Sequence, residues 1–444
     1  MLKLKTFGSV CSGIEAATLV FRPMGLLPVW YSEIADFPSR LLRLKYPEVV
    51  NLGDMNFISE KIASGEVPVP DFLCGGTPCQ AFSLAGWKNG LNDDRGQLTL
   101  KYIDILDEID KKRADNGRGR AIFLWENVEG VLKDKTNAFG CFLAGLVGAD
   151  DIIKVKKWSS SGVIYGRKRN VAWRVIDSKY LGLPQQRRRL YLLGGGKDFH
   201  PENVLFELGS EPLDPFVAAD CGVESNKSIS LFGLDELQGL AVADVMSDTS
   251  RKINNSRVEI FRSYTDCLYA AYGTKWNGNA AAYNGSLFVS QDGRLRRLTP
   301  LECERLMGLP DNYTNIAGAK DTQRYQAVGN SWAIPVVRWI AERLMRYDDL
   351  EDISCPDAID IKDGGYALFL LGKSGIIWGG RRVNASTVVS DYRTKSLLDI
   401  IDTDAMDKFY ISPKGCSGIL RRKTERNLRI NKRLEVVLKR CSIQ

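Results

Sequence analysis

The sequence predicts an α/β protein with an open, doubly wound sheet, a smaller irregular or β-rich domain and a C-terminal extension. Through the first two hundred residues, short apolar runs alternate with longer, more polar segments that favour helices. From about 201 to 294, Asn, Ser, Asp and Gly interrupt this pattern, which is typical of an irregular or β-rich module. Alternating strands and helices predict a sheet that binds its ligands at the carboxyl ends of the strands.

Five apolar runs carry the strand prediction. Each ends at Gly or at a polar or charged residue, as buried parallel strands do where they lead into functional loops. The runs span residues 4–10, 27–34, 71–76, 121–128 and 189–196. Between the third and the fourth, residues 98–115 predict a helix, because apolar side chains recur there at helical spacing: Leu98, Tyr102, Ile105, Leu106 and Ile109.

A further helix is predicted in "RRLTPLECERLMGLP". Thr299 is its expected N-cap, Pro300 takes the first helical position, and Glu302 stands three residues after the cap. Residues 350–444 then hold short β-like runs and a basic tail with nine basic residues and two acidic ones. The basic residues are Arg421, Arg422, Lys423, Arg426, Arg429, Lys432, Arg433, Lys439 and Arg440.

Composition excludes several classes of protein. No apolar run approaches the roughly 18 residues of a membrane helix, and the N-terminus does not resemble a signal peptide, so we expect a cytoplasmic protein. The ten cysteines form no CxxC pair, which disfavours a disulfide scaffold. The single histidine, His200, leaves no His-rich metal site, and we predict no metal.

Three strand ends carry residues suited to chemistry. Cys79 lies in the loop after the third run, where a thiolate would be accessible, although a loop cysteine is also often structural. Glu126 ends the fourth run, where partial burial would raise its pKa for proton donation, although a capping or surface acid fits the same position. Gln185, Arg187 and Arg189 alternate with Gln186 and Arg188, so the first three share one face and the two arginines are expected to point into the site.

Taken together, these residues resemble the motifs of the DNA cytosine C5-methyltransferases. "PCQ" at 78–80, "ENV" at 126–128 and Q-x-R-x-R at 185–189 stand in the family's order. "DDRGQL" at 93–98, the predicted helix segment at 296–310 and "RYQAVGNSWAIP" at 324–335 are similar to further motifs. Six ordered motifs over residues 5 to 346 are a specific signal, whereas any single one is weak.

The resemblance implies a Rossmann-like, S-adenosylmethionine-dependent methyltransferase fold and a division of labour among these residues. Cys79 would attack carbon 6 of a cytosine flipped out of the duplex. Glu126 would hydrogen-bond nitrogen 3 and the exocyclic amine, and Arg189, helped by Arg187, would bind the base carbonyl. The positions that match the family's S-adenosylmethionine site are Cys11, Gly13, Ile14, Glu33, Ile34, Asp54, Met55, Pro78, Asn330 and Ser331.

One loop departs from the family's pattern. "CSGIEA" carries Cys11 where most members have an aromatic residue, and Glu15 where a glycine is common. The departure concerns cofactor affinity rather than the catalytic residues, which are all present.

The resemblance also implies a domain division and a set of partners. We expect a catalytic and cofactor-binding domain at 1–199, a target-recognition domain at 200–295, a return segment at 296–346 and a basic extension at 350–444. Within the recognition domain, Tyr272, Trp276 and the loop at 277–284 are expected to reach a DNA groove. The expected partner is double-stranded DNA, bound by a monomer that methylates one sequence in restriction-modification or in protection of phage DNA, with a cognate endonuclease as a further partner.

Two alternatives and the role of the tail stay open at this level. A tRNA cytosine methyltransferase is disfavoured because that branch's Cys-Phe-Thr signature is missing, and a catalytically inactive DNA-binding homologue is the other alternative. The segment "KFYISPKGCSGILRR" is similar to one carried by phage and prophage members. The tail that follows fits either a clamp on DNA phosphates or a solvated helix packed on the enzyme.

Overall fold

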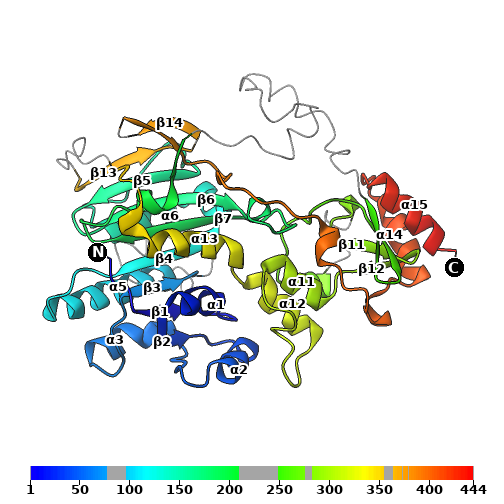
Figure 1. Ribbon diagram of the computed structural model, residues 1–444, viewed down its shortest axis with the longest axis horizontal. Helices are drawn as coiled ribbons and strands as arrows, with labels where there is room; N and C mark the ends of the chain where they lie inside the picture. Colours follow the sequence, from blue (N-terminus) through cyan, green and yellow to red (C-terminus); the bar gives the residue numbers. More distant parts are fainter. Residues whose placement is uncertain are drawn as a thin grey trace.

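The computed structural model describes residues 2–77, 97–209, 249–275, 283–354, 364–372, 374–378 and 380–443. Two units lie side by side along the long axis of the molecule (Figure 1). The larger unit holds the N-terminus and a broad sheet, and the smaller one holds a short sheet, the C-terminal helices and the C-terminus (Figure 1). Among the described residues, no helix has both the length and the apolar character that crossing a membrane requires.

The larger unit is built on an eight-stranded sheet. Its strands are β1 (Thr6–Val10), β2 (Leu27–Ser32), β3 (Phe72–Gly75), β4 (Ile122–Val128), β5 (Ser161–Gly166), β6 (Asn170–Asp177), β7 (Arg188–Gly195) and β13 (Tyr366–Leu370). Their order is β13-β5-β6-β7-β4-β3-β1-β2. Strands β1 to β4 pair in parallel, whereas β7, β6, β5 and β13 join by antiparallel pairings.

The five predicted strands are confirmed as β1, β2, β3, β4 and β7, but the expected parallel direction is wrong for β7. This strand runs antiparallel to β4, with Val128 opposite Arg189. A continuous apolar run indicates that both faces of a strand are buried. Central strands are buried in this way whether they are parallel or antiparallel, so the run does not give the direction of the strand. The antiparallel direction brings the first residues of β7 beside the last residues of β4.

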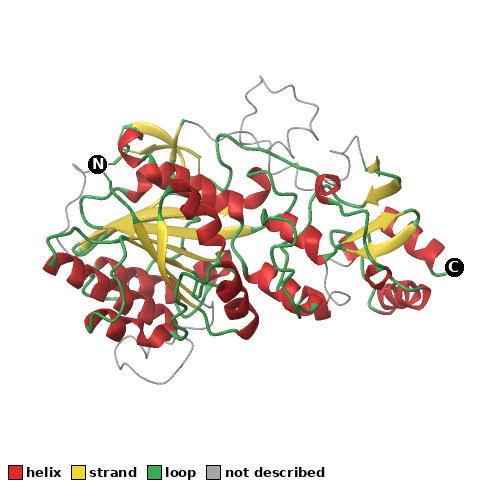
Figure 2. Ribbon diagram, turned by 60° about the horizontal axis from the view of Figure 1, so that its bottom comes forward, coloured by secondary structure: helices red, strands yellow, loops and turns green. Residues whose placement is uncertain are grey.

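Helices cover both faces of this sheet, so the predicted doubly wound architecture is confirmed (Figure 2). Along β4, Ile122 and Leu124 belong to one buried cluster, and Phe123 and Trp125 to the other. The first cluster takes in α1 (Ala16–Phe21), α7 (Pro201–Leu205) and α13 (Ile334–Met345). The second takes in α3 (Ile58–Ala63), α5 (Gln97–Asp115) and α6 (Ala138–Val147).

The predicted helix at 98–115 is confirmed as α5, because the residues at helical spacing from Tyr102 to Ile109 are buried against the sheet. The larger unit also contains α2 (Asp36–Lys45). Short 3₁₀ segments also occur among the described residues: η1 (Arg22–Met24), η2 (Met55–Phe57), η3 (Glu129–Lys133), η4 (Ser178–Tyr180), η7 (Tyr347–Asp349), η9 (Leu397–Ile400) and η10 (Asp407–Phe409).

The smaller unit contains a four-stranded antiparallel sheet in the order β12-β11-β10-β9. Its strands are β9 (Ser250–Ile253), β10 (Ser256–Ile260), β11 (Phe288–Gln291) and β12 (Arg294–Arg297), and the helices nearby are α9 (Tyr272–Lys275), α11 (Pro300–Met307) and α12 (Asp321–Asn330). Helix α11 begins at the predicted cap, with the full capping box between Thr299 and Glu302. Arg296 and Glu302, both fully buried, pair at 2.7 Å and join the sheet to this helix.

One expectation for this unit is wrong. The side chain of Tyr272 is fully buried, and its hydroxyl donates to the Leu287 carbonyl while it accepts from the Leu298 amide, so it cannot reach a DNA groove. Trp276 and most of the predicted loop at 277–284 lie outside the described residues.

The segment after residue 350 contributes to both units. Strand β13 forms the edge of the large sheet beside β5, and β14 (Ser374–Trp378) and β15 (Arg381–Asn384) form a small sheet with β8 (Glu207–Leu208). Helices α14 (Pro413–Glu425) and α15 (Lys432–Cys441) pack against the four-stranded sheet in a shared buried cluster. The predicted extension therefore supplies strands and helices to both units. The predicted domain boundaries stay a prediction.

Candidate active site

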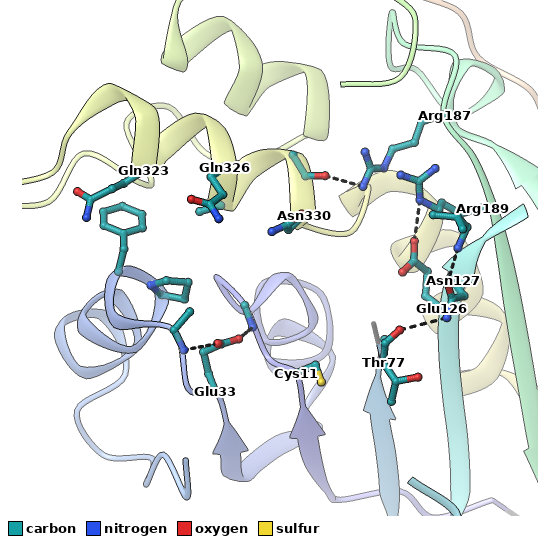
Figure 3. Close-up of a pocket in the computed structure, with 18 of the residues that line it drawn as sticks. Cys11, Glu33, Thr77, Glu126, Asn127, Arg187, Arg189, Gln323, Gln326 and Asn330 are labelled. Carbon is teal, nitrogen blue, oxygen red and sulfur yellow. Dashed lines mark hydrogen bonds and ion pairs between the residues drawn. The ribbon is translucent and has the colours of Figure 1, made fainter. Parts of the chain in front are cut away.

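A cavity of about 660 Å³ lies between the carboxyl ends of the parallel strands and helix α12. Figure 3 shows Cys11 and Glu33 on one side of it, Glu126, Arg187 and Arg189 on the other, and the α12 side chains across the top. The lining residues are Cys11, Gly13, Glu33, Ala35, Asp36, Phe37, Pro38, Gly76, Thr77, Glu126, Asn127, Val128, Arg187, Arg189, Gln323, Gln326, Ala327, Gly329 and Asn330. The cavity therefore joins most of the strand ends that the sequence singles out.

An ion pair between Glu126 and Arg189 forms one end of the cavity. The Arg189 Nε lies 3.2 Å from the Glu126 Oε1, and both side chains are largely buried. Burial raises the pKa of Glu126 above its usual value, and the charges of Arg189 and Arg187 oppose this rise. A carboxyl group in this setting can hold a proton nearer to neutral pH than an exposed glutamate, as the sequence predicts.

Arg187 is buried and held by main-chain carbonyls. Its guanidinium donates to the oxygens of Leu268, Gly329 and Ser331, at 3.1, 3.1 and 2.8 Å. Burial and the neighbouring Arg189 lower the pKa of Arg187. These bonds fix the end of α12 and the 262–268 segment against β7, so Arg187 positions the walls of the cavity as well as lining it.

The alternation predicted for residues 185–189 is confirmed. Gln185 is buried, and its amide nitrogen donates to the Leu306 carbonyl at 2.9 Å while its oxygen accepts from the Leu268 amide at 2.8 Å. Arg188 points the other way and forms a two-pronged pair with Glu129, with both distances 2.8 Å.

Cys267 is a site residue that sequence reasoning missed. Its sulfur accepts from the Arg187 Nη1 and the Arg189 Nη2, each at 3.5 Å. It belongs to the segment that leaves β10 and returns to the catalytic sheet, where Thr265 exchanges backbone hydrogen bonds with Pro184 and Gln186. Its position depends on this long-range pairing, so no local pattern around residue 267 signals it.

The predicted nucleophile Cys79 and the neighbouring Pro78 lie outside the described residues. The residue before them, Thr77, is held by two hydrogen bonds from β4. The side-chain amide of Asn127 donates to the Thr77 carbonyl at 3.1 Å, and the Trp125 indole donates to the Thr77 hydroxyl at 3.0 Å. The last described residue before Pro78 is therefore anchored to β4 beside Glu126.

The other end of the cavity is formed by the loop after β1 and the end of β2. Glu33 accepts from the Gly13 amide at 2.8 Å through one oxygen and from the Ala35 amide at 2.7 Å through the other. The Cys11 thiol contacts the Met55 sulfur at 3.6 Å. Burial, with the charges of Glu33 and Asp54, raises the pKa of Cys11 to about 12, so this thiol stays protonated.

The remaining predicted cofactor residues surround this end or lie outside it. Ile14 is buried in the core, whereas Ile34 is 77% exposed, and neither lines the cavity. Asp54 caps η2 by accepting from the Asn56 amide. Asn330 lines the cavity, whereas Ser331 does not line it and accepts from Arg187 through its carbonyl. Their roles toward a cofactor stay predictions.

Two groups of lining residues were not predicted. Asp36, Phe37 and Pro38 are the first residues of α2, and they follow the predicted run at 27–34 after one residue, which is the signal that would have found them. Gln323 and Gln326 share one face of α12 with Asn330, at spacings of three and four, but the sequence alone does not show that this face meets the cavity.

The unusual "CSGIEA" loop has a structural explanation. Cys11, Gly13 and Glu15 all have positive φ angles, of 48°, 56° and 59°. Glu15 offsets the cost of this conformation by capping α1, since one oxygen of its carboxyl group accepts from the Thr18 amide at 3.2 Å. Burial raises the pKa of Glu15 to about 8.

Residues 5–346 match the family model for the C-5 cytosine-specific DNA methylases, and the chain belongs to this family. The match spans both units and every residue of the cavity.

The names of individual relatives refer to different methyltransferase activities. The chain is 33% identical over 464 residues to the "DNA N-6-adenine-methyltransferase" of Escherichia phage P1. This alignment covers 78% of this chain and 62% of that protein. This chain therefore spans less than two thirds of that relative. It is 27% identical over 359 residues to the type II methyltransferase M.DsaV of Dactylococcopsis salina, which covers 78% of this chain and 87% of the relative.

Among solved structures, the chain is similar to the Entamoeba histolytica methyltransferase EhMeth, with a TM-score of 0.46 and 16% identity. The alignment covers 79% of this chain and 100% of that one.

Glu15→Gln tests the buried carboxyl in the cofactor loop. In the folded protein Glu15 holds its proton up to about pH 8, whereas in the unfolded chain it titrates near 4.5, so the wild-type protein loses stability as pH rises between these values. Gln does not titrate. We expect the free energy of unfolding of the variant, relative to wild type, to increase steadily from about pH 5 to about pH 8 in denaturant titrations.

Glu48→Gln is the matched control, because Glu48 forms a half-exposed pair with Arg22. A stability difference for Glu15→Gln that stays constant across this pH range contradicts the buried, protonated carboxyl.

Cys267→Ala tests the link to the two arginines. Loss of a weak sulfur acceptor worth about 1 kcal/mol is expected to lower kcat about five-fold, with the KM for S-adenosylmethionine unchanged. Cys267→Ser keeps an acceptor and should retain most of the rate. An alanine variant with the wild-type kcat in single-turnover methylation would show that the thiol does not position the arginines.

Proposed function

We propose that the protein is a DNA (cytosine-5-)-methyltransferase that modifies a flipped-out cytosine in one duplex sequence through a covalent bond to Cys79. The observation that carries this proposal is the buried Glu126–Arg189 pair at 3.2 Å, which opens into the same cavity as the Glu33 strand end. A proton donor beside a fixed cation suits a base that gains electron density on its ring when a nucleophile adds to it.

The chain's residues divide the reaction as follows. The Cys79 thiolate forms a bond to carbon 6, while Glu126 gives its proton to nitrogen 3 and Arg189 donates to the carbonyl oxygen, so the electron pair displaced from the C5–C6 bond does not build up as charge on the ring. Carbon 5 then accepts the methyl group. Nitrogen 3 returns its proton to Glu126, and solvent water takes the proton from carbon 5. The electron pair of that C–H bond restores the C5–C6 double bond, the C6–S bond breaks, and Cys79 leaves as the thiolate.

The other end of the cavity fits S-adenosylmethionine, which supplies the methyl group when bound. Each Glu33 oxygen accepts only one backbone hydrogen bond, so each keeps a lone pair free for a ribose hydroxyl. Gln323, Gln326 and Asn330 add amide groups opposite. Cys11 is smaller than the aromatic residue common in the family, and as a neutral thiol it adds no charge to this end.

The biological role follows from the substrate. We propose modification of one short sequence, either within a restriction-modification system or as protection of phage DNA. The name of the phage P1 relative refers to adenine N6, which makes the identity of the modified base a necessary part of the test.

The activity is tested in a bacterial host that lacks its own DNA methylation. Plasmid DNA is sequenced by a method that reads 5-methylcytosine and N6-methyladenine at single-base resolution, after expression of wild type, Cys79→Ala or Cys441→Ala. We expect 5-methylcytosine in one short context with wild type and with Cys441→Ala, which removes a thiol from α15. Cys79→Ala should abolish it.

Three outcomes contradict the proposal. N6-methyladenine without 5-methylcytosine would assign a different base, and modification by the Cys79→Ala variant would exclude the covalent route. Soluble wild-type protein without any modified DNA base would favour an RNA substrate or a binding role.

A further inference from the structure

The turn that joins α14 to α15, residues 426–432, carries an excess of positive charge. The segment from 421 to 440 has nine basic and two acidic residues, a net charge of +7, which equals the net charge of the whole protein. The rest of the chain is therefore neutral in sum. Such a concentration of one sign repels itself and costs stability unless a partner neutralises it.

Most of the basic side chains in this segment have partners. Arg421 pairs with Glu425, and Lys423 and Lys439 share Glu435. Arg433 and Arg440 donate to the main-chain oxygens of Phe261 and Gly293. Arg422 is half-buried, and its Nε has no hydrogen-bond partner among the described residues. Three exposed cations, Arg426, Arg429 and Lys432, have neither an acidic nor a main-chain partner there.

Helix electrostatics explain only one of these three. Arg426 follows the last residue of α14, where the negative end of the helix dipole favours a cation. Lys432 is the first residue of α15, at the positive end of a dipole that disfavours it. Arg429 lies in the turn and belongs to no helix. Folding therefore gives no reason for Arg429 and Lys432 to be basic.

The turn is held rigidly. Leu428 and Ile430 are partly buried against the cluster beneath α14 and α15, while Arg429 between them is exposed. The backbone amide of Asn431 donates to the Tyr283 carbonyl at 2.8 Å, and its side chain donates to the Phe261 carbonyl at 3.1 Å. The three cations are thus fixed on the smaller unit.

The point of attachment also connects the turn with the active site. Phe261 is the residue at which the chain leaves β10, and six residues later Cys267 contacts both catalytic arginines. The basic turn therefore lies at the end of the four-stranded sheet from which the chain runs to the cavity. Figure 1 shows α14 and α15 beside β11 and β12 in this smaller unit.

We propose that residues 426–432 form a phosphate clamp: Arg426, Arg429 and Lys432 bind the phosphodiester backbone of the DNA duplex whose cytosine occupies the cavity. The contacts add affinity without reading bases, since backbone phosphates carry no sequence information. This inference rests on the proposed function, because it assumes that the substrate is duplex DNA.

The test compares full-length wild type with Arg426→Gln/Arg429→Gln/Lys432→Gln. Binding to a fluorescent duplex of about 30 base pairs is measured at several salt concentrations. Each phosphate contact contributes roughly 0.9 to the slope of log affinity against log salt, so we expect the slope of the triple variant to fall by about two to three. The matched control, Lys101→Gln/Lys111→Gln/Lys112→Gln, removes the same charge from α5 and should leave the slope nearly unchanged.

The outcomes separate this inference from the proposed function. The clamp is overturned if the salt slope of the triple variant equals that of wild type, or if the slope of the α5 control falls by the same amount. In either case, methylation of DNA by the wild-type protein leaves the proposed function standing. Wild-type protein that binds a hairpin RNA but not the duplex overturns both. Thermal unfolding checks that the triple variant is folded. The clamp is supported if this variant methylates DNA at low salt but loses activity at a lower salt concentration than wild type does.

Discussion

The antiparallel pairing of β7 with β4 is the constraint on which the site depends. The arginines stand at the start of β7, and in a parallel sheet they would lie at the edge opposite the end of β4. Because β7 runs the other way, Val128 faces Arg189 and Glu126 lies within 3.2 Å of its guanidinium. Burying two charges is costly, and their mutual attraction, with the Cys267 sulfur on the arginine, offsets part of this cost. The fold thereby holds a desolvated acid and a cation at one point before any substrate arrives.

Arg187 extends this constraint to the rest of the chain. Its bonds to the carbonyls of Leu268, Gly329 and Ser331 join β7 to both later segments that complete the cavity. One of these segments is the end of α12, which covers the cofactor end, and the other leads back to the four-stranded sheet. On the proposed function, these bonds give a physical route from sequence recognition in the smaller unit to the two arginines.

Much of this architecture follows from local sequence patterns. Apolar runs that end at glycine or polar residues locate five strands, and the Thr299 capping box locates the start of α11. Strand period correctly separates Arg187 and Arg189 from Arg188, because alternation is a property of the extended backbone itself. The raised pKa of Glu126 follows from its place at the end of a buried run.

The missed features depend on contacts between distant residues. Strand direction is set by the β5–β6 hairpin between β4 and β7, which a hydrophobic pattern does not encode. Cys267 reaches the two arginines, and Gln326 reaches the cavity, only after the chain folds back on itself. The burial of Tyr272, which sequence reasoning assigned to a DNA groove, results from its packing under α12. The pairing of β13 from the C-terminal segment with β5 is likewise a contact between distant residues, which the local sequence does not indicate.

The proposal on which the mechanism depends is that the Glu126–Arg189 end of the cavity receives a cytosine ring for attack by Cys79. It is tested most directly by trapping: a duplex that contains 5-fluorocytosine in the methylated sequence cannot lose the substituent at carbon 5, so the enzyme stays bound to the base in the presence of S-adenosylmethionine. Peptide mass spectrometry of the trapped complex is predicted to find one modified residue, Cys79. An active enzyme that gives no adduct, or an adduct on another residue such as Cys267, would contradict the account.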